Sequence, residues 1–349
     1  MPAGRKYKVL MLFHTTTPTP RGYDYAEEFA DPDNMYTEND VYQALLANNY
    51  EVRLLGLFND IRPLLEEIAE FKPDVIFNLV EVFNNQAQWD KNVAALLEML
   101  GIPYTGARAD ALFICNNKAL SKKILRFHRL RVARFQVFYQ GHRIWRPKII
   151  KLPAIIKPLC EEASRGISQA SVVDSDEGFS ERIKFIHDNM QMDAIAEEYI
   201  DGRELYVGVM GTKRLQVLPP REMKFGQLSD EEPRIATYKA KWDDDYRERW
   251  NIRSEFAGKL ANGVWERIQD SCKRAYRALN IRSYLRFDIR VTPEGRVYII
   301  EPNANPCIAR IDEFAQAAEK IGLSYNQLIR RIVTMALAEK TVQPKRKKK

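Results

Sequence analysis

Residues 285–305 read LRFDIRVTPEGRVYIIEPNAN, in which two runs of strand-forming residues flank the turn sequence TPEG. This pattern predicts a β-hairpin. With PEGR as the turn, Asp288 lies opposite Glu301, and Arg286 lies opposite Asn303. Because side chains alternate along a strand, all four point to the same face of the hairpin. Like charges opposite each other destabilise a strand pair, so the two facing carboxylates suggest a role beyond folding.

The other face of the hairpin is predicted to be apolar and to pack against a core. Its members are Phe287, Ile289, Val291, Tyr298 and Ile300. The polar face offers two carboxylates and an amide, which are the hard oxygen ligands that Mg²⁺ prefers. Mg²⁺ usually keeps several coordination positions for water and phosphate, so a nucleotide is expected to supply the remaining ligands. The alternative is an ordinary solvent-facing side of a two-faced sheet.

The composition is that of a soluble globular protein of two or three domains. The chain has 349 residues, of which 45% are hydrophobic and 29% are charged. No apolar run approaches the roughly 18 to 20 residues that span a bilayer. The short stretch YKVLMLF near the N-terminus reads as a first strand rather than a signal peptide. The four cysteines form no CxxC pair, which argues against a zinc cluster or a disulfide framework and favours a cytoplasmic protein.

The positive charge of the chain is concentrated at its C-terminus. Residues 345–349 supply five charges of the net +7, which leaves +2 for the rest of the chain. We predict that residues 341–349 form a disordered, solvated basic tail. Contact of this tail with RNA, an acidic lipid or an acidic partner is the alternative. The body of the chain is not expected to bind nucleic acid or a membrane.

The N-terminal third of the chain alternates strand and helix patterns. Thr37 and Asp40 resemble a capping box at the start of a helix, and Pro63 suits the first turn of another. Strands are predicted at 7–13, 52–58 and 74–80, and helices at 39–49, 62–71 and 89–100. This alternation predicts an α/β layer domain.

From residue 116 onward the pattern becomes α+β. A helix at 116–127 begins with an asparagine cap, and strands with one helix lead to a turn at Asp201 and Gly202. Residues 238–246 read as a mobile surface loop, with an active-site lid as the alternative. These changes divide the chain into domains at 1–115, 116–203 and 204–340, followed by the tail at 341–349.

Several charged residues outside the hairpin occur where their charge needs a partner. Lys157 interrupts the apolar strand PAIIKPL, where an ammonium group is costly unless an anion pairs with it. The loop EEASRGIS that follows offers backbone N–H groups to phosphate, and Lys118 at a helix start also favours a nearby anion. Glu197, Glu198 and Glu204 flank the Asp-Gly turn and suit ribose hydroxyls. Each feature also has an ordinary explanation. Lys157 could lie at the exposed end of its strand, the loop could be a simple turn, and the glutamates could be surface residues.

The order of these motifs resembles the ATP-grasp superfamily and, within it, the D-alanine–D-alanine ligase family. The resemblance runs from about residue 90 to 335. The segments that carry it are MLGIPYTGARADALFICNNKALSKKIL, LPAIIKPL, AIAEEYIDGRELYVGV, and LRFDIRV…YIIEPNANP with AAEKIGLSYNQLIRRI after it. It implies an α/β N-terminal domain followed by an α+β ATP-grasp fold, in which two lobes close on ATP.

The resemblance also implies which residues bind the nucleotide. Lys118 and Lys157 would contact its phosphates, and Glu204 would contact its ribose. Its adenine would be held by Glu197 and by the backbone near Tyr199 and Ile200.

Metal ligands and catalytic residues follow from the same resemblance. Two Mg²⁺ ions, or Mn²⁺ in their place, would be held by Asp288, Glu301 and Asn303. Arg286 would stabilise charge on the transferred phosphoryl group or on the oxyanion. Lys241 lies at the position of the family's lid lysine, and the loop that starts at Ser164 would cover the phosphates.

The implied reaction joins a carboxylate to an amine at the expense of ATP. A substrate carboxylate attacks the γ-phosphoryl group to give an acyl phosphate, and the amine then displaces phosphate through a tetrahedral intermediate. The substrates would be small molecules or peptides, and a homodimer is compatible with this interpretation. Two alternatives keep the fold: a kinase that phosphorylates a small molecule, and a non-catalytic ATP-binding regulatory protein.

The chain departs from the D-alanine enzymes at positions that touch substrate. Trp242 stands where the lid has a tyrosine, Cys307 where the last motif has a glycine, and Asp312 where a serine would receive a terminal carboxylate. A carboxylate at position 312 repels another carboxylate and suits an amine. The His-Gly motif after the third strand is absent, and Glu38 is the candidate for the amino-binding glutamate. We therefore predict a ligase whose substrate is not D-alanine.

Overall fold

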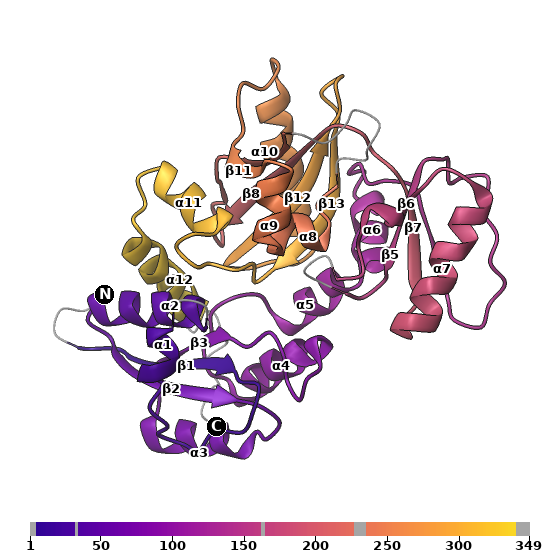
Figure 1. The fold of residues 1–349 in the computed structure, drawn as a ribbon. Coiled ribbons are helices and arrows are strands. Elements are labelled where there is room, and N and C mark those ends of the chain that lie inside the picture. The colour runs from indigo at the N-terminus through magenta and orange to yellow at the C-terminus, as the bar shows by residue number, and fades with distance from the viewer. Residues whose placement is uncertain (1–4, 32–33, 162–164, 227–234, 340–349) are drawn as a thin grey trace, which may run out of the picture.

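The computed structural model describes residues 5–31, 34–161, 165–226 and 235–339, which form three β-sheets (Figure 1). Two predictions fall outside these described residues. They concern Ser164 in the phosphate-covering loop and the basic tail at 341–349.

The N-terminal region is a parallel sheet with the strand order β2-β1-β3 and helices packed against it. Its elements are β1 (Lys8–His14), α1 (Ala26–Ala30), α2 (Tyr36–Ala47), β2 (Glu51–Leu57), α3 (Arg62–Phe71), β3 (Val75–Leu79), η1 (Ala87–Trp89) and α4 (Asp90–Leu100). The apolar strands suit a sheet that is covered on both faces. Pro63 lies in the first turn of α3, which confirms that prediction, and Gly101 ends α4 with a φ of 69°.

The central region starts with two helices and continues into an antiparallel sheet of order β4-β7-β5-β6. Its elements are α5 (Ala109–Asn116), α6 (Lys118–Phe127), β4 (Phe135–Phe138), β5 (Ala154–Pro158), η2 (Gln169–Ser171), β6 (Val172–Val173), α7 (Asp176–Met190) and β7 (Ala194–Glu198). The predicted asparagine cap is present, because the Asn117 side chain accepts a hydrogen bond from the Leu120 N–H at 2.9 Å.

The C-terminal region is built on an antiparallel sheet of order β11-β10-β8-β12-β13, with β9 paired to β8. Its strands are β8 (Arg203–Met210), β9 (Gln216–Val217), β10 (Arg221–Phe225), β11 (Ile252–Phe256), β12 (Tyr284–Val291) and β13 (Val297–Ala304). Its helices are α8 (Tyr238–Trp242), α9 (Asp244–Arg249), α10 (Val264–Ala278), α11 (Glu313–Lys320) and α12 (Tyr325–Glu339).

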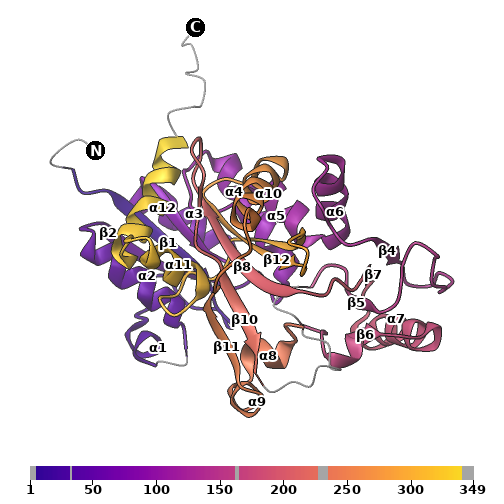
Figure 2. The same cartoon turned by 90° about the horizontal axis from the view of Figure 1, so that it is seen from above.

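The N-terminal and C-terminal regions share hydrophobic clusters, whereas the main cluster of the central region is separate. One shared cluster contains Leu10 of β1 and Phe287 of β12. Another joins Ile329 of α12 to the N-terminal sheet, and α12 packs on α2 and β3. In the central region, Ile156 of β5 packs with Phe179 of α7. The central sheet with α7 accordingly stands beside a larger body made of the two other regions (Figure 2).

The hairpin has the predicted pairs at the end that carries the polar residues. Arg286 of β12 lies opposite Asn303 of β13, and Asp288 lies opposite Glu301. Strand β12 is central in its sheet, because β8 pairs with its other edge. Asp288 is therefore held between two hydrogen-bonded strands, and Glu301 lies on the neighbouring edge strand β13.

A β-bulge in β13 changes the predicted apolar face. Ile289 pairs with Ile299 rather than with Ile300, and Ile299 is the residue buried in the core. Ile300 lines a cavity, and Tyr298 lies half-buried opposite Arg290. The prediction that Tyr298 and Ile300 face the core is therefore wrong. The remaining predicted members of this face are buried, namely Phe287, Ile289 and Val291.

The predicted capping box is wrong because its residues serve tertiary contacts. Helix α2 begins at Tyr36, so Thr37 lies inside it, and the Thr37 hydroxyl is 3.3 Å from Sγ of Cys307. The carboxylate of Asp40 accepts hydrogen bonds from the backbone N–H and the Nε of Arg310 at 2.9 and 3.1 Å. These contacts fasten α2 to the segment that follows the hairpin.

Residues 238–246 form helices rather than the predicted surface loop. The Thr237 side chain accepts a hydrogen bond from the Ala240 N–H and caps α8. The Asp243 side chain accepts one from the Tyr246 N–H and caps α9. The chain thus brings Lys241 to the site on a short capped helix.

Gly202 joins the central and C-terminal regions and is predicted to tolerate no side chain. Its φ is 143°, and a Cβ built there would lie 2.3 Å from the backbone oxygen of Val291. We expect Gly202→Ala to lower the free energy of unfolding by about 1–3 kcal/mol, because the backbone must leave a conformation that alanine avoids. The measurement is urea unfolding followed by circular dichroism.

Gly258→Ala is the matched control, because a Cβ at Gly258 meets nothing within 4 Å. Equal stability of the two variants would contradict the close approach between Gly202 and Val291.

Candidate functional site

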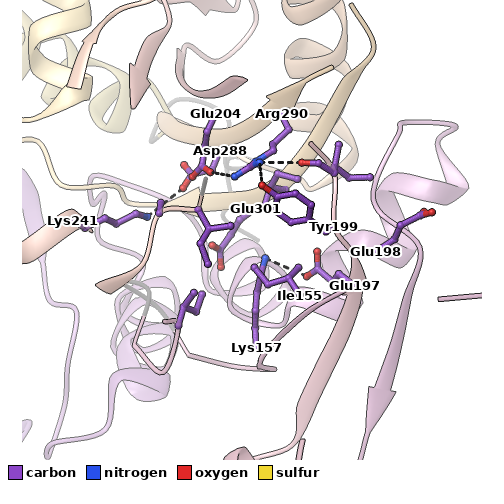
Figure 3. A pocket seen from close by; sticks show the side chains of 15 residues that line it. Ile155, Lys157, Glu197, Glu198, Tyr199, Glu204, Lys241, Asp288, Arg290 and Glu301 are labelled. Atoms are coloured by element: carbon purple, nitrogen blue, oxygen red, sulfur yellow. Dashed lines mark hydrogen bonds and ion pairs between the residues drawn. The ribbon is translucent and has the colours of Figure 1, made fainter. Parts of the chain in front are cut away.

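A cavity lies between the central and C-terminal sheets, where β5 and β7 approach β12 and β13 (Figure 3). Eight of the twelve predicted site residues line it: Lys157, Glu197, Tyr199, Ile200, Glu204, Lys241, Asp288 and Glu301. The cavity has a volume of about 60 Å³. Pockets for ligands usually begin at roughly 300 Å³, so this cavity is smaller than a typical ligand pocket.

Cations surround the two opposed carboxylates of the hairpin. Asp288 accepts hydrogen bonds from Nε of Arg286 and from Nδ2 of Asn303, both at 2.9 Å, and Nζ of Lys241 is 3.7 Å away. Burial raises the pKa of Asp288, and the neighbouring cations oppose this rise. Glu301 lies 3.0 Å from Nζ of Lys118. Burial alone would raise the pKa of Glu301, but nearby lysines outweigh it and lower that pKa to about 2.

The hairpin residues fit Mg²⁺ only together with ligands from outside the protein. Asp288, Glu301 and Asn303 supply two carboxylates and one amide on one face of the hairpin. Among the described residues, no group of three or more His, Cys, Asp or Glu side chains is arranged to hold a metal ion. Mg²⁺ commonly binds through one or two carboxylates plus phosphate and water, and this donor set meets that requirement.

Arg286 is held between two carboxylates and an aromatic ring. Besides Asp288, its guanidinium lies 3.6 Å from the carboxylate of Glu313 and 5.1 Å from the ring centre of Tyr206. Burial would lower the pKa of Arg286, but the two carboxylates outweigh it and raise that pKa. The guanidinium therefore remains charged and oriented, which suits a group that must stabilise developing negative charge.

Two lysines and a glutamate form a buried cluster at the wall of this cavity. The carboxylate of Glu197 lies 3.2 Å from Nζ of Lys122 and 3.6 Å from Nζ of Lys157. All three side chains are at least nine-tenths buried. Sequence reasoning missed Lys122, although it lies four residues after Lys118 and therefore on the same face of α6.

Arg290 is a second site residue that sequence reasoning missed. Its guanidinium is 2.6 Å from the carboxylate of Glu204, and it donates hydrogen bonds to the Ile200 carbonyl at 3.0 Å and the Tyr199 hydroxyl at 3.2 Å. It thus joins three of the four residues predicted for ribose and adenine, and Figure 3 shows its contacts with Glu204 and Tyr199. A signal was available, because Arg290 follows Asp288 by two positions and so shares its face of the strand.

A second, larger cavity of about 790 Å³ adjoins the first, and the two share Lys241 and Glu301. Arg286 and Asn303 face it from the hairpin. Its other side is formed by α2 and by the segment that follows the hairpin. The residues there include Tyr36, Asn39, Asp40, Cys307 and Asp312. Apart from Ser164, the structure therefore brings every predicted site residue to these two adjoining cavities or, for Lys118, into contact with a residue that lines them.

Comparison with known proteins identifies the family. The model of the D-ala D-ala ligase C-terminus matches residues 127–334. The D-alanine–D-alanine ligase of Geotalea uraniireducens is 28% identical over 302 residues, which cover 85% of this chain and 88% of that protein. The uncharacterized protein y4sG of Sinorhizobium fredii is 28% identical over 262 residues, covering 75% of this chain and 74% of that protein.

Solved structures show the same fold. The D-alanine–D-alanine ligase of Bacillus anthracis complexed with ATP superposes with a TM-score of 0.72 at 19% identity, covering 96% of this chain and 99% of that one. In the described part of the chain, no helix has the length and apolar character needed to cross a membrane. The family match extends over more than half of the chain, and the ATP-grasp fold agrees with it. This chain belongs to the D-alanine–D-alanine ligase family of ATP-dependent carboxylate–amine ligases.

Proposed function

We propose that this chain joins a carboxylate to an amine through an acyl phosphate, using ATP and Mg²⁺, and that D-alanine is not its substrate. The single observation behind the substrate part is Asp312. Its carboxylate lines the larger cavity at the position that the family resemblance assigns to a carboxylate-binding serine. A negative charge there disfavours the terminal carboxylate of an amino acid such as D-alanine.

The residues of the nucleotide side fit the proposed chemistry. Bound Mg²⁺ would neutralise charge on the phosphates, and Asp288, Glu301 and Asn303 would hold it. Lys157 lines the nucleotide cavity and would attract the phosphates. Arg286 faces the larger cavity and would stabilise negative charge on the phosphoryl group or the oxyanion. The reaction requires mainly positioning and preorganised positive charge, which these side chains supply.

Asp312 has unused capacity to accept a hydrogen bond. One interaction of its carboxylate is with the thiol of Cys307. The oxygen Oδ2 is buried and has no hydrogen-bond partner among the described residues. Burial raises the pKa of Asp312. An ammonium group of a substrate would satisfy this carboxylate and remove the cost of burying it.

Further acids extend this negative region into the N-terminal region. Glu81 follows β3 and is exposed to solvent, although nearby protein atoms still reduce its solvation. Burial and the charges of Asp90 and Asp312 raise the pKa of Glu81 to about 6. Burial also raises the pKa of Glu38, the candidate amino-binding residue. The amine substrate would therefore enter a region in which negative charge accumulates.

Removal of one metal-binding carboxylate should stop catalysis without unfolding the protein. We expect Asp288→Asn to lower ATP-dependent phosphate release by a factor of 10³ or more, which is the order seen when a charge-stabilising group is lost. Glu294→Gln, in the exposed turn of the same hairpin, is the control and should keep wild-type turnover. Unchanged turnover in Asp288→Asn would remove the metal assignment.

Substrate choice should depend on position 312. A screen of amino acids and small peptides with Mg-ATP is expected to give no phosphate release with D-alanine alone. For the amine that the screen identifies, Asp312→Ser should lower kcat/KM about tenfold or more and leave the KM for ATP unchanged, because a charged hydrogen bond is lost. Strong phosphate release with D-alanine, with the dipeptide detected by mass spectrometry, would overturn the substrate proposal.

The buried carboxyl of Asp90 should make stability depend on pH. Burial raises its pKa to about 6, against about 3.9 in the unfolded chain. Its contribution to the free energy of unfolding is therefore fully present below pH 4 and is lost as the pH rises through 6. Asp90→Asn should therefore be more stable than wild type at pH 7.5, on the order of 2 kcal/mol, and not at pH 4. Urea unfolding at both pH values measures this, with exposed Asp270→Asn as the control.

A further inference from the structure

Helix α6 carries two adjacent lysines with opposite environments. The side chain of Lys122 is 1% exposed, whereas Lys123 lies on the surface. Nζ of Lys122 lies 3.2 Å from one oxygen of Glu197, and Nζ of Lys157 lies 3.6 Å from the other. One buried carboxylate is thus shared by two buried ammonium groups. Such an arrangement carries an excess positive charge, and a buried charge is costly unless an anion compensates it.

Only one of these two lysines is placed to meet a nucleotide. Lys157 and Glu197 line the nucleotide cavity, whereas Lys122 is not part of its lining. Lys122 also donates a hydrogen bond to the backbone oxygen of Ile300, the extra residue of the bulge in β13. Through these contacts Lys122 joins α6, β7 and β13 behind the cavity wall.

We propose that Lys122 is a positioning residue that neutralises Glu197 and thereby leaves the charge of Lys157 available to the phosphates of the nucleotide. This inference rests on the proposed use of ATP. Without Lys122, Glu197 and Lys157 would form a neutral pair, and the ammonium group would be drawn toward the carboxylate. With Lys122 present, Glu197 has its own partner, and the charge of Lys157 faces the cavity, which Glu301 also lines.

The test compares nucleotides that differ in phosphate number. Isothermal titration calorimetry with Mg²⁺ gives the Kd of AMP-PNP and of AMP, and their ratio isolates the contribution of the β and γ phosphates. In Lys122→Met we expect the ratio Kd(AMP)/Kd(AMP-PNP) to fall about tenfold, as for the loss of one charge-assisted contact to phosphate. Lys123→Met is the matched control and should keep the wild-type ratio.

A second substitution separates this charge effect from a loss of structure. In the double variant Lys122→Met/Glu197→Gln, residue 197 no longer neutralises Lys157, and the interaction of Lys157 with Glu301 is that of the wild type, so the ratio should return toward the wild-type value. A structural defect caused by Lys122→Met would not be repaired in this way. A ratio that stays low in the double variant, or that is unchanged in Lys122→Met, overturns the proposal.

Two further outcomes are informative. If Lys122→Met does not fold, Glu197→Gln alone still tests the idea, because its ratio should equal or exceed that of the wild type, and a fall contradicts the proposal. If the wild-type protein binds no AMP-PNP, the proposed function fails as well. Wild-type binding with no effect at Lys122 rejects only the role of this lysine.

Discussion

The opposed carboxylates of the hairpin are the constraint on which the rest of the site depends. Asp288 and Glu301 face each other across a strand pair inside a cleft, where two uncompensated negative charges would oppose folding. Cations reach them from four places: Arg286 from the same strand, Lys241 from α8, Lys118 from the start of α6 and Lys157 from β5. The charge requirement therefore brings α6, α8 and the hairpin together, and their meeting point is the proposed nucleotide site.

Much of this arrangement could be predicted because strand periodicity is local. The pairing of Asp288 with Glu301 followed from the turn sequence alone. The same reasoning failed for Ile300, because a β-bulge shifts the register there and no glycine marks it in the sequence. The failure has a functional side, because the bulge turns Ile300 into the cavity and offers its backbone oxygen to Lys122.

Residues whose roles arise from tertiary contacts could not be assigned from the sequence. Thr37 and Asp40 match a capping pattern, yet they contact a segment about 270 residues later in the chain. Arg290 shares the strand face of Asp288, but its partner Glu204 comes from the neighbouring strand β8, which the sequence does not indicate. Lys122 gives no sign of burial in an otherwise amphipathic helix. Each of these residues is defined by a partner in another element, and local patterns do not report such partners.

On the proposed function, the chemistry and the choice of substrate reside at different contacts in this fold. The central and C-terminal regions meet around Lys157 and Glu301, where the chain keeps the residues expected of an ATP-grasp ligase. The N-terminal region meets the segment after the hairpin around Asp312, where the chain departs from the D-alanine enzymes. The ion pair of Asp40 with Arg310 fixes this second contact, within a body that shares hydrophobic clusters. On the proposed function, a new amine specificity therefore requires no change in the contact that binds ATP.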